Sequence, residues 1–521
     1  MRNKSVIIIL SIILIGLFLR LWNFPNLFYF AIDEEKAAYI ITQITQGKHL
    51  PTVGHPSSIG FRLGPLLYYF IAPFYKLFGP NPIVWGYLSV FASIISMYLI
   101  YQIGKKLNKI TGIFALILYS FSYLNILYDR RGWQLSFHSL IALTILFSLL
   151  KIKENKTNFF YLLTVALIAA SQFEVATLLF IPTAFISLLI LKLKLNKKAL
   201  TICFLLFFLS QVGLFLFDIK HNFMNTKYLI NYFRPGTVER INTNIPLTNM
   251  RAVYLAHNLI PSTLARTISV FSPSNVAIQY ANCPIYLSYK QTNIPLLFKF
   301  MPILILILFA ISTIKNWQSS SDISIIQKTI FVYFGLLFGG ITIYTYIFNG
   351  EMAEYYLLGS FAYFFIVIAS ILGFLFRSRG KIIILILLFL FIVDNSNHMF
   401  TSQNPYGLNH KLDAINYSLS KVGNNSFILE SFQTCWYSGG YRYLYTLKKH
   451  DPLQSYMDQY LNEYYNPDKK VTTEYQVIVL TPELIGNNPS GFDKFRNEIN
   501  SSSLFKKQFG TIEIYINKIN R

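Results

Sequence analysis

Two adjacent carboxylates, Asp33 and Glu34, stand shortly after the first apolar segment of the chain. That segment, residues 6–21, is long enough to cross a bilayer, and the residues before it are basic. Because basic flanks stay in the cytoplasm, the two carboxylates should emerge at the outer membrane surface. An ionised carboxylate there can act as a general base on a lipid-borne substrate. Alternatively, both residues only favour the N-terminus of the helix that follows.

Two arginines, Arg130 and Arg131, form a second polar group on the outer side, between the third and fourth predicted spans. Cations on this side oppose the positive-inside trend, so they need compensating anions. A guanidinium group offers a planar fork of donors that suits phosphate oxygens, and Arg62 is a third such cation on the outer side. A local salt bridge to Asp129 is the alternative role for the two arginines.

Glu174 interrupts an apolar stretch near an outer turn. A carboxylate at membrane depth is costly unless it is paired, and such residues usually face a polar cavity. We expect the arginines or a bound ion as its partner, with a solvated turn residue as the alternative. Asp218 and the Glu354-Tyr355 pair complete the outer polar set. The histidines are scattered, which argues against a dedicated zinc site, and a role for a divalent metal stays open.

The composition identifies a membrane protein. Of 521 residues, 54% are hydrophobic and only 13% are charged, whereas soluble domains have about a quarter charged residues. The net charge of +22 comes largely from short breaks between apolar runs, which would all fall on one side of a membrane. This is the positive-inside pattern, and it argues against nucleic acid as a partner. The basic breaks are residues 105–109, 151–156, 192–198 and 377–381.

Apolar runs of spanning length predict a transmembrane domain of about eleven helices in residues 1–394. An odd number places the N terminus in the cytoplasm and the C terminus outside, in a multi-pass protein of the plasma membrane. The outer loops 22–81 and 218–298 are long, and the first should contain helices near 34–46 and 65–78. The predicted spans are 5–21, 82–103, 111–127, 135–151, 158–170, 174–193, 199–217, 299–315, 328–348, 355–376 and 381–394.

The last segment, residues 395–521, has no long apolar runs and alternates short strand-like and helix-like stretches. We therefore predict a small extracytoplasmic α/β domain after the transmembrane domain. Its predicted strands are 427–429, 475–480 and 511–516, and its predicted helices lie near 407–421, 452–464 and 491–502.

The order of these polar segments resembles that of integral-membrane GT-C glycosyltransferases, in particular the family-39 group of protein O-mannosyltransferases and aminoarabinose transferases. The resemblance extends over most of residues 1–376. This chain departs from the pattern at Gln134, where relatives have Asn, and in the turn at Glu174, where relatives often have His. The matching segments are Asp33-Glu34, residues 62–79, Arg130-Arg131-Gly132-Trp133-Gln134, residues 217–226 and, more weakly, Glu354-Tyr355-Tyr356.

The resemblance implies a GT-C-like α-helical polytopic fold with juxtamembrane helices. It also implies a glycosyltransferase that moves a hexosyl or pentosyl group from a polyprenyl-phosphate-linked sugar. The acceptor would be a hydroxyl group of a protein, lipid or glycan on the extracytoplasmic face. Asp33 would deprotonate this hydroxyl, and Glu34 would orient a partner or the sugar. Arg130, Arg131 and Arg62 would hold the charge of the leaving lipid phosphate.

A multi-span transporter or lipid flippase is the main alternative. Such proteins place their substrate sites near the bilayer midplane between repeated halves, whereas the polar groups here gather at one surface and the sequence has no evident internal repeat. Two further alternatives are a polysaccharide polymerase or ligase of another membrane fold, and a receptor whose outer α/β domain binds a partner. Soluble-enzyme signatures such as a Gly-rich phosphate loop, His-Glu-x-x-His or paired Cys-x-x-Cys are missing from the sequence.

Overall fold

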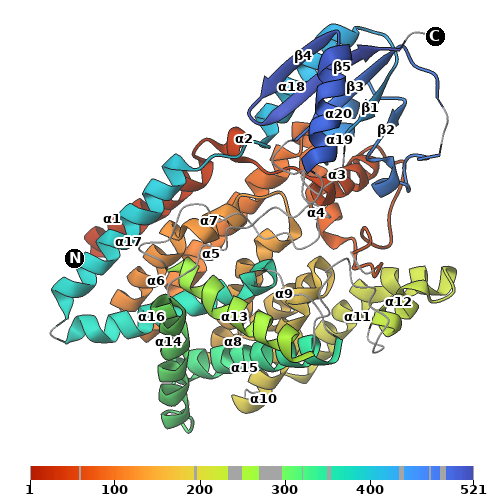
Figure 1. The fold of residues 1–521 in the computed structure, drawn as a ribbon. Coiled ribbons are helices and arrows are strands. Elements are labelled where there is room, and N and C mark those ends of the chain that lie inside the picture. The colour runs from red at the N-terminus through yellow and green to blue at the C-terminus, as the bar shows by residue number, and fades with distance from the viewer. Residues whose placement is uncertain are drawn as a thin grey trace.

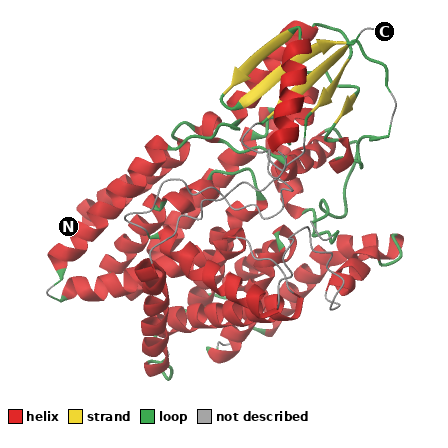
Figure 2. Cartoon of the chain, in the orientation of Figure 1, coloured by secondary structure: helices red, strands yellow, loops and turns green. Residues whose placement is uncertain are grey.

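A body of helices carries a small β-sheet domain at one end, formed by the C-terminal part of the chain (Figures 1 and 2). The computed structural model describes residues 2–57, 60–192, 196–232, 249–268, 296–319, 321–348, 354–378, 380–432, 439–468, 471–481 and 489–519. Residues 233–248 and 269–295 of the second predicted outer loop lie outside the described residues.

Helices form the whole membrane part within the described residues. In chain order these are α1 (Arg2–Leu21), α2 (Phe24–Leu27), α3 (Ile32–Thr45), α4 (Leu66–Phe78), α5 (Ile83–Leu107), α6 (Lys109–Phe121), α7 (Tyr123–Asp129), α8 (His138–Lys153), α9 (Phe159–Phe173), α10 (Phe180–Ile190), α11 (Lys197–Lys220), α12 (Met224–Tyr232), α13 (Asn249–Thr267), α14 (Leu296–Lys315), α15 (Asp322–Phe348), α16 (Leu358–Arg377) and α17 (Lys381–Thr401). The helices α3 and α4 confirm the two helices predicted in the first outer loop.

Seven described helices are long and apolar enough to cross a membrane. An eighth span results if α6 and α7, which are bent by 66° relative to each other, are counted together. Three more of the predicted spans are apolar helices of 10–17 residues, namely Ser5–Leu21, Phe159–Phe173 and Val175–Ile190. The polytopic helical fold class is confirmed, whereas length and composition support seven or eight of the roughly eleven predicted spans.

The spans differ in how deeply they are buried in the protein. In the most apolar windows of the spans that contain α8 and α16, 78% of the residues are buried, against 6% in α11. An apolar helix that exposes nearly all of its side chains on the protein surface needs lipid around it. The helices α8 and α16 therefore form the centre of the bundle, and α11 lies at its lipid-facing periphery.

The basic loop ends meet at one end of the bundle. Lys106, near the end of α5, lies 2.7 Å from Glu154 after α8 and 3.0 Å from Asp322 at the start of α15. Lys151 contacts the same Glu154 carboxylate. These contacts bring two of the four basic breaks, residues 105–109 and 151–156, to the same end of the bundle; that all four share one side of the membrane stays a prediction.

The C-terminal domain is built on a five-stranded sheet with the order β2-β1-β3-β5-β4. The strand β1 pairs in parallel with β2 and β3, whereas β5 pairs antiparallel with β3 and β4. One core cluster joins one face of the sheet to α18, and a second joins the other face to α20. The elements are α18 (Leu408–Val422), β1 (Phe427–Glu430), α19 (Tyr441–Leu447), β2 (Gln454–Ser455), β3 (Tyr475–Leu480), α20 (Pro489–Ser502), β4 (Phe505–Phe509) and β5 (Ile512–Lys518).

The three predicted strands of this domain are confirmed as β1, β3 and β5, but the helix predicted near 452–464 is wrong. That segment contains β2 and a 3₁₀ turn at Asp458–Tyr460. The Asp458 carboxylate accepts a hydrogen bond from the backbone N–H of Ser455 (2.9 Å), and such local side-chain bonds compete with helix formation. The helix α17 continues to Thr401, so the predicted domain boundary at 394–395 falls inside it.

Candidate active site

Three consecutive acidic residues lie in the first turn of α3, and their side chains point in different directions. Successive side chains of an α-helix are rotated by about 100°, so Asp33, Glu34 and Glu35 face different surroundings. Asp33 is half-buried, whereas Glu34 and Glu35 are buried. Glu34 accepts a hydrogen bond from the backbone N–H of Ala31 (3.2 Å), which satisfies one free donor at the helix start. Glu34 therefore does cap the N-terminus of α3, as the alternative interpretation of the sequence predicted, but it also has a second partner.

The structure brings Glu34 together with Arg131. A guanidinium nitrogen of Arg131 lies 2.6 Å from the Glu34 carboxylate, and both side chains are buried. The guanidinium group also stands 4.1 Å from the ring centre of Tyr29 and 4.0 Å from that of Trp133. Cation–π contacts on two aromatic rings hold its plane in place. Glu34 and Arg131 thus form a fixed ion pair beside Asp33.

The other two predicted phosphate ligands have partners elsewhere. Arg130 donates to the backbone carbonyl of Trp22 (2.8 Å) and lies over the ring of Phe24. Arg62 forms an ion pair with Glu463 of the C-terminal domain and donates to the carbonyl of Gly54. Among the described residues, neither arginine forms an ion pair with Asp33 or Glu34.

Asp33 has the electrostatic surroundings of a base. Its pKa is raised from 3.8 to about 6, because burial and the charge of Glu34 raise it more than the charges of Lys36 and Arg131 lower it. Lys36 stands three residues after Asp33 on α3, a spacing that places two side chains on the same helix face. Sequence reasoning missed Lys36, although this spacing was visible.

Glu174 lies near Asp33 and has an amide as its partner. It begins the 3₁₀ turn after α9 and accepts a hydrogen bond from the side-chain amide of Gln134 (3.4 Å). The charge of Asp33 acts on Glu174, which places the two carboxylates in one region. The structure does not pair Glu174 with an arginine: among the described residues it forms no ion pair.

His55 and Tyr68 lie in the same region. The His55 ring accepts or donates a 2.6 Å hydrogen bond with the Tyr68 hydroxyl. Burial and the charges of Lys36 and Arg62 lower the pKa of His55 to about 3, so its ring is neutral at physiological pH. The charge of Asp33 also acts on Tyr68. A neutral imidazole and a phenol are suited to hydrogen bonding with a sugar or an acceptor.

Glu354 and Tyr355 contact aromatic residues of the segment that carries Arg131. The buried Glu354 carboxylate pairs with Arg266 of α13 and accepts a hydrogen bond from the Tyr128 hydroxyl (3.0 Å). The ring of Tyr355 packs edge-on against Trp133 at 5.2 Å. Arg266 was missed because its helix precedes Glu354 by many residues, and no local pattern connects them.

Asp218 has a local structural role. Its carboxylate accepts hydrogen bonds from the backbone N–H of Asn225 (2.7 Å) and from Thr226, and so caps α12. Asn225 in turn bonds both backbone groups of Arg62. Asp218 therefore connects α11 to the first outer loop, and its predicted place in the cavity stays a prediction.

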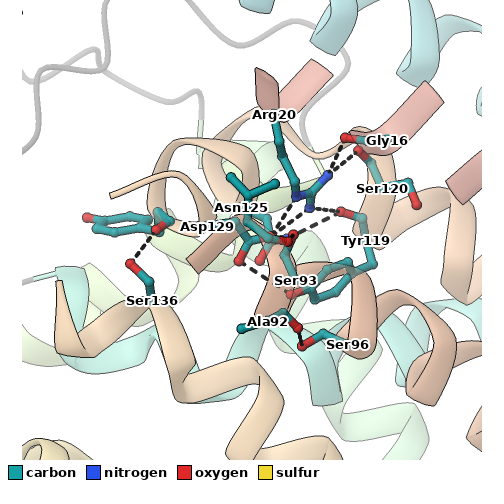
Figure 3. Close-up of polar contacts among 12 residues, drawn as sticks. Gly16, Arg20, Ala92, Ser93, Ser96, Tyr119, Ser120, Asn125, Asp129 and Ser136 are labelled. Carbon is teal, nitrogen blue, oxygen red and sulfur yellow. Dashed lines mark hydrogen bonds and ion pairs between the residues drawn. The ribbon is translucent and has the colours of Figure 1, made fainter. Parts of the chain in front are cut away.

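A buried network fixes the segment that carries the two arginines (Figure 3). Arg20 of α1 is fully buried, and its guanidinium group contacts the Asp129 carboxylate at 2.6 Å and 3.0 Å. Asn125 donates to the same carboxylate (2.9 Å). Asp129 thus pairs with Arg20 rather than with Arg130 or Arg131, which corrects the local salt bridge considered from the sequence.

The guanidinium group of Arg20 also forms hydrogen bonds at the bend between α6 and α7. It donates to the backbone carbonyls of Gly16 (3.0 Å), Tyr119 (3.2 Å) and Ser120 (3.1 Å). Carbonyls near the end of α6 would otherwise be buried without a donor. The network therefore holds α1, α6 and α7 together immediately before Arg131. Within the described residues no group of three or more His, Cys, Asp or Glu side chains is arranged to hold a metal ion.

Comparison with known proteins gives a family match and a fold. Residues 55–215 match the family described as dolichyl-phosphate-mannose-protein mannosyltransferase. The apo crystal structure of the Archaeoglobus fulgidus oligosaccharyltransferase is 12% identical, covers 91% of this chain and 69% of its own, and has a TM-score of 0.52. The same enzyme tethered with an acceptor peptide is 11% identical, with the same coverage and a TM-score of 0.53. ArnT from Cupriavidus metallidurans bound to undecaprenyl phosphate is 10% identical over 99% of this chain and 98% of its own, with a TM-score of 0.47. No curated protein matches the chain.

The family match and the fold agree with each other. The matched residues 55–215 include Arg131, Gln134 and Glu174, which lie around the start of α3. The similarity to the oligosaccharyltransferase covers the helical body and the C-terminal domain, and at this identity it shows the fold. The resemblance inferred from the sequence is therefore confirmed: in the sequence of residues 55–215 and in its fold, this multi-pass membrane protein is similar to membrane glycosyltransferases of the GT-C type.

Proposed function

We propose that the protein transfers a sugar from a polyprenyl-phosphate donor to an acceptor hydroxyl, with Asp33 as the general base. One observation carries this proposal: the half-buried Asp33, with a pKa of about 6, lies within the electrostatic reach of Lys36 and Arg131. A base whose pKa is close to the working pH transfers protons efficiently. Fixed cations beside it can stabilise an anionic leaving group.

In the proposed reaction, Asp33 accepts the proton of the acceptor hydroxyl while the hydroxyl oxygen bonds to the anomeric carbon of the sugar. The bond from that carbon to the phosphate oxygen breaks, and the lipid phosphate leaves with the electron pair. Because a phosphate is a good leaving group, its charge needs stabilising more than its oxygen needs a proton. Orientation of the two reactants supplies the rest of the rate enhancement.

Lys36 is our main candidate for the cation that holds the phosphate. The charge of Arg131 is already balanced by Glu34, and Arg62 and Arg130 have partners of their own. Lys36 makes neither an ion pair nor a hydrogen bond with the described residues, yet its charge acts on both Asp33 and His55. We assign Arg131 a supporting role, in which Glu34 orients it toward the phosphate.

The polyprenyl-phosphate donor class is supported by the family that matches residues 55–215, whose description names a dolichyl-phosphate-linked mannose and a protein acceptor. We carry over the donor class, and leave the acceptor as a hydroxyl of a protein, lipid or glycan. Glu174 and Tyr355 would lie on the sugar side of the site, next to Gln134 and Trp133. The positive-inside rule, applied to the basic end of the bundle, supports the extracytoplasmic face as the place of this chemistry.

The proposed function is tested by offering purified protein a panel of polyprenyl-phosphate sugars, with sugar nucleotides in parallel. Release of lipid phosphate that requires an added acceptor is the expected result. Release from sugar nucleotides alone would contradict the proposed donor class. Movement of the lipid across proteoliposomes without any sugar transfer would instead favour a transporter or flippase.

Replacing Lys36 by Met should lower kcat/KM for the donor about 10- to 100-fold, because a hydrogen bond to a charged group contributes about 1.5–3 kcal/mol. The measurement is the rate of lipid phosphate release as a function of donor concentration. Lys48→Met is the matched control, since Lys48 is an exposed lysine of the same loop. Equal kcat/KM values in the two variants would remove Lys36 from the phosphate site.

A further inference from the structure

The C-terminal domain holds the backbone on both sides of Asp33. Before Asp33, the carbonyl of Phe28 accepts the backbone N–H of Leu408 (3.0 Å). The carbonyl of Phe30 accepts a hydrogen bond from the Lys411 ammonium group (2.7 Å). Leu408 and Lys411 both belong to α18, so this helix contacts the extended segment that leads into α3. Figure 1 shows the C-terminal sheet domain standing over α3.

After Asp33, the Glu35 carboxylate reaches into the same domain. Glu35 is 0% exposed, and its two oxygens accept the backbone N–H groups of Gly440 and Tyr443, each at 2.8 Å. A carboxylate that accepts one such bond at each of its two oxygens is strongly oriented. The third acidic residue of the cluster therefore binds the C-terminal domain, while Asp33 remains at the site.

Two glycines allow the close approach. A Cβ atom on Gly439 would stand 2.6 Å from the backbone nitrogen of Ile32, the residue before Asp33. Gly440 has a φ of +94°, and a Cβ there would stand 2.8 Å from the ring of Phe30. Only glycine accommodates both the contact and the positive φ. The ammonium group of Lys411, which binds the carbonyl of Phe30, also donates to the carbonyl of Gly439 (2.6 Å) and so connects the two segments.

We propose that Lys411, Gly439 and Gly440 of the C-terminal domain, together with Glu35, are positioning residues that set the place of Asp33. Catalysis then requires the C-terminal domain to be seated on α3, although none of these residues touches the reacting atoms. This inference rests on the proposed role of Asp33 as the base.

The charges in the contact support the inference. Burial lowers the pKa of Lys411 to about 7, and the charges of Glu35 and Glu34 act against this shift. Burial raises the pKa of Glu35, while the two N–H groups, Lys411 and Arg442 lower it. Two buried charges that depend on each other make the contact sensitive to the loss of either partner.

The test compares Lys411→Met and Gly439→Ala in the full chain with Asp33→Asn and with Arg496→Met. Arg496 pairs with Glu513 on the face of the sheet covered by α20, so Arg496→Met removes an ion pair of the same domain away from α3. Gly439→Ala changes no charge, and it keeps the test decisive if Lys411→Met does not fold. Thermal unfolding and protease resistance identify the variants that fold.

We expect a folded Lys411→Met or Gly439→Ala protein to lose kcat about 100-fold, because a small displacement of a catalytic group has an effect of this size. The donor KM should stay within about twofold of wild type, because Lys36 and Arg131 are untouched, and Arg496→Met should keep wild-type kcat. Wild-type kcat in a folded variant, or a donor KM that rises as much as kcat falls, overturns the inference. If this occurs while Asp33→Asn is inactive, the proposed function stands; an active Asp33→Asn overturns both.

Discussion

Replacing Asp33 by Asn is expected to lower kcat for sugar transfer about 10²- to 10⁴-fold, the usual contribution of a general base. The amide is nearly the same size as the carboxylate, but it cannot accept the proton of the acceptor hydroxyl. Protein folding should be preserved, because Glu34 and Glu35, rather than Asp33, make the contacts that anchor α3. The measurement is single-turnover release of lipid phosphate at saturating donor.

Asp413→Asn is the matched control for this variant. Asp413 is an exposed aspartate of α18, so its replacement makes the same change in charge away from the site. Its kcat should equal that of the wild type. An Asp33→Asn protein whose kcat lies within a few-fold of the control would exclude Asp33 as the base.

The second large effect is expected at the buried ion pair between Arg20 and Asp129. Arg20→Met or Asp129→Leu leaves one buried charge without a partner, which should lower the free energy of unfolding by about 3–5 kcal/mol. The double variant should regain only the part of this loss that comes from the unpaired charge, because the backbone carbonyls of Gly16, Tyr119 and Ser120 still lose their Arg20 donor. Thermal or denaturant unfolding in detergent measures the effect.

Lys106→Met provides the comparison for a more exposed ion pair. The side chains of Lys106 and Glu154 are 34% and 25% exposed, and pairs of this kind contribute about 0–1 kcal/mol. If the single variants at Arg20 and Asp129 are no less stable than Lys106→Met, the buried network does not hold α1, α6 and α7 together.

The elements around the site were predictable because their signals are local. The apolar runs, the two helices of the first outer loop and the three principal strands follow from periodicity and composition. The helix predicted at 452–464 failed because side-chain hydrogen bonds of Asp458 organise a turn there. A pattern of residue types alone does not show such a bond.

The partners of the charged residues were less predictable, because they depend on how distant helices pack. The sequence indicated that acidic and basic groups meet on the outer side, and Glu34 does meet Arg131. It did not indicate that Asp129 pairs with Arg20, which is 109 residues earlier and inside a predicted span. Glu35 stands next to the predicted pair, but its partners lie more than 400 residues later, so no local pattern indicated its role.

The pH dependence of kcat/KM tests the role of Asp33 most directly, because it reports the ionisation of the free enzyme. Burial raises the pKa of Asp33 to about 6, and only the ionised form can accept a proton. On the acid side of the profile, the activity should therefore fall as the pH drops through about 6. His55, with a pKa of about 3, stays neutral over this range and does not produce the change.

Lys36→Met provides the decisive comparison within the same measurement. The charge of Lys36 lowers the pKa of Asp33, so removing it should move the acid limb of the profile to higher pH. The role of Asp33 as the base predicts an acid limb near pH 6 in the wild type and one at higher pH in Lys36→Met. A wild-type profile that stays flat down to pH 4.5, or a limb that Lys36→Met does not move, would contradict it.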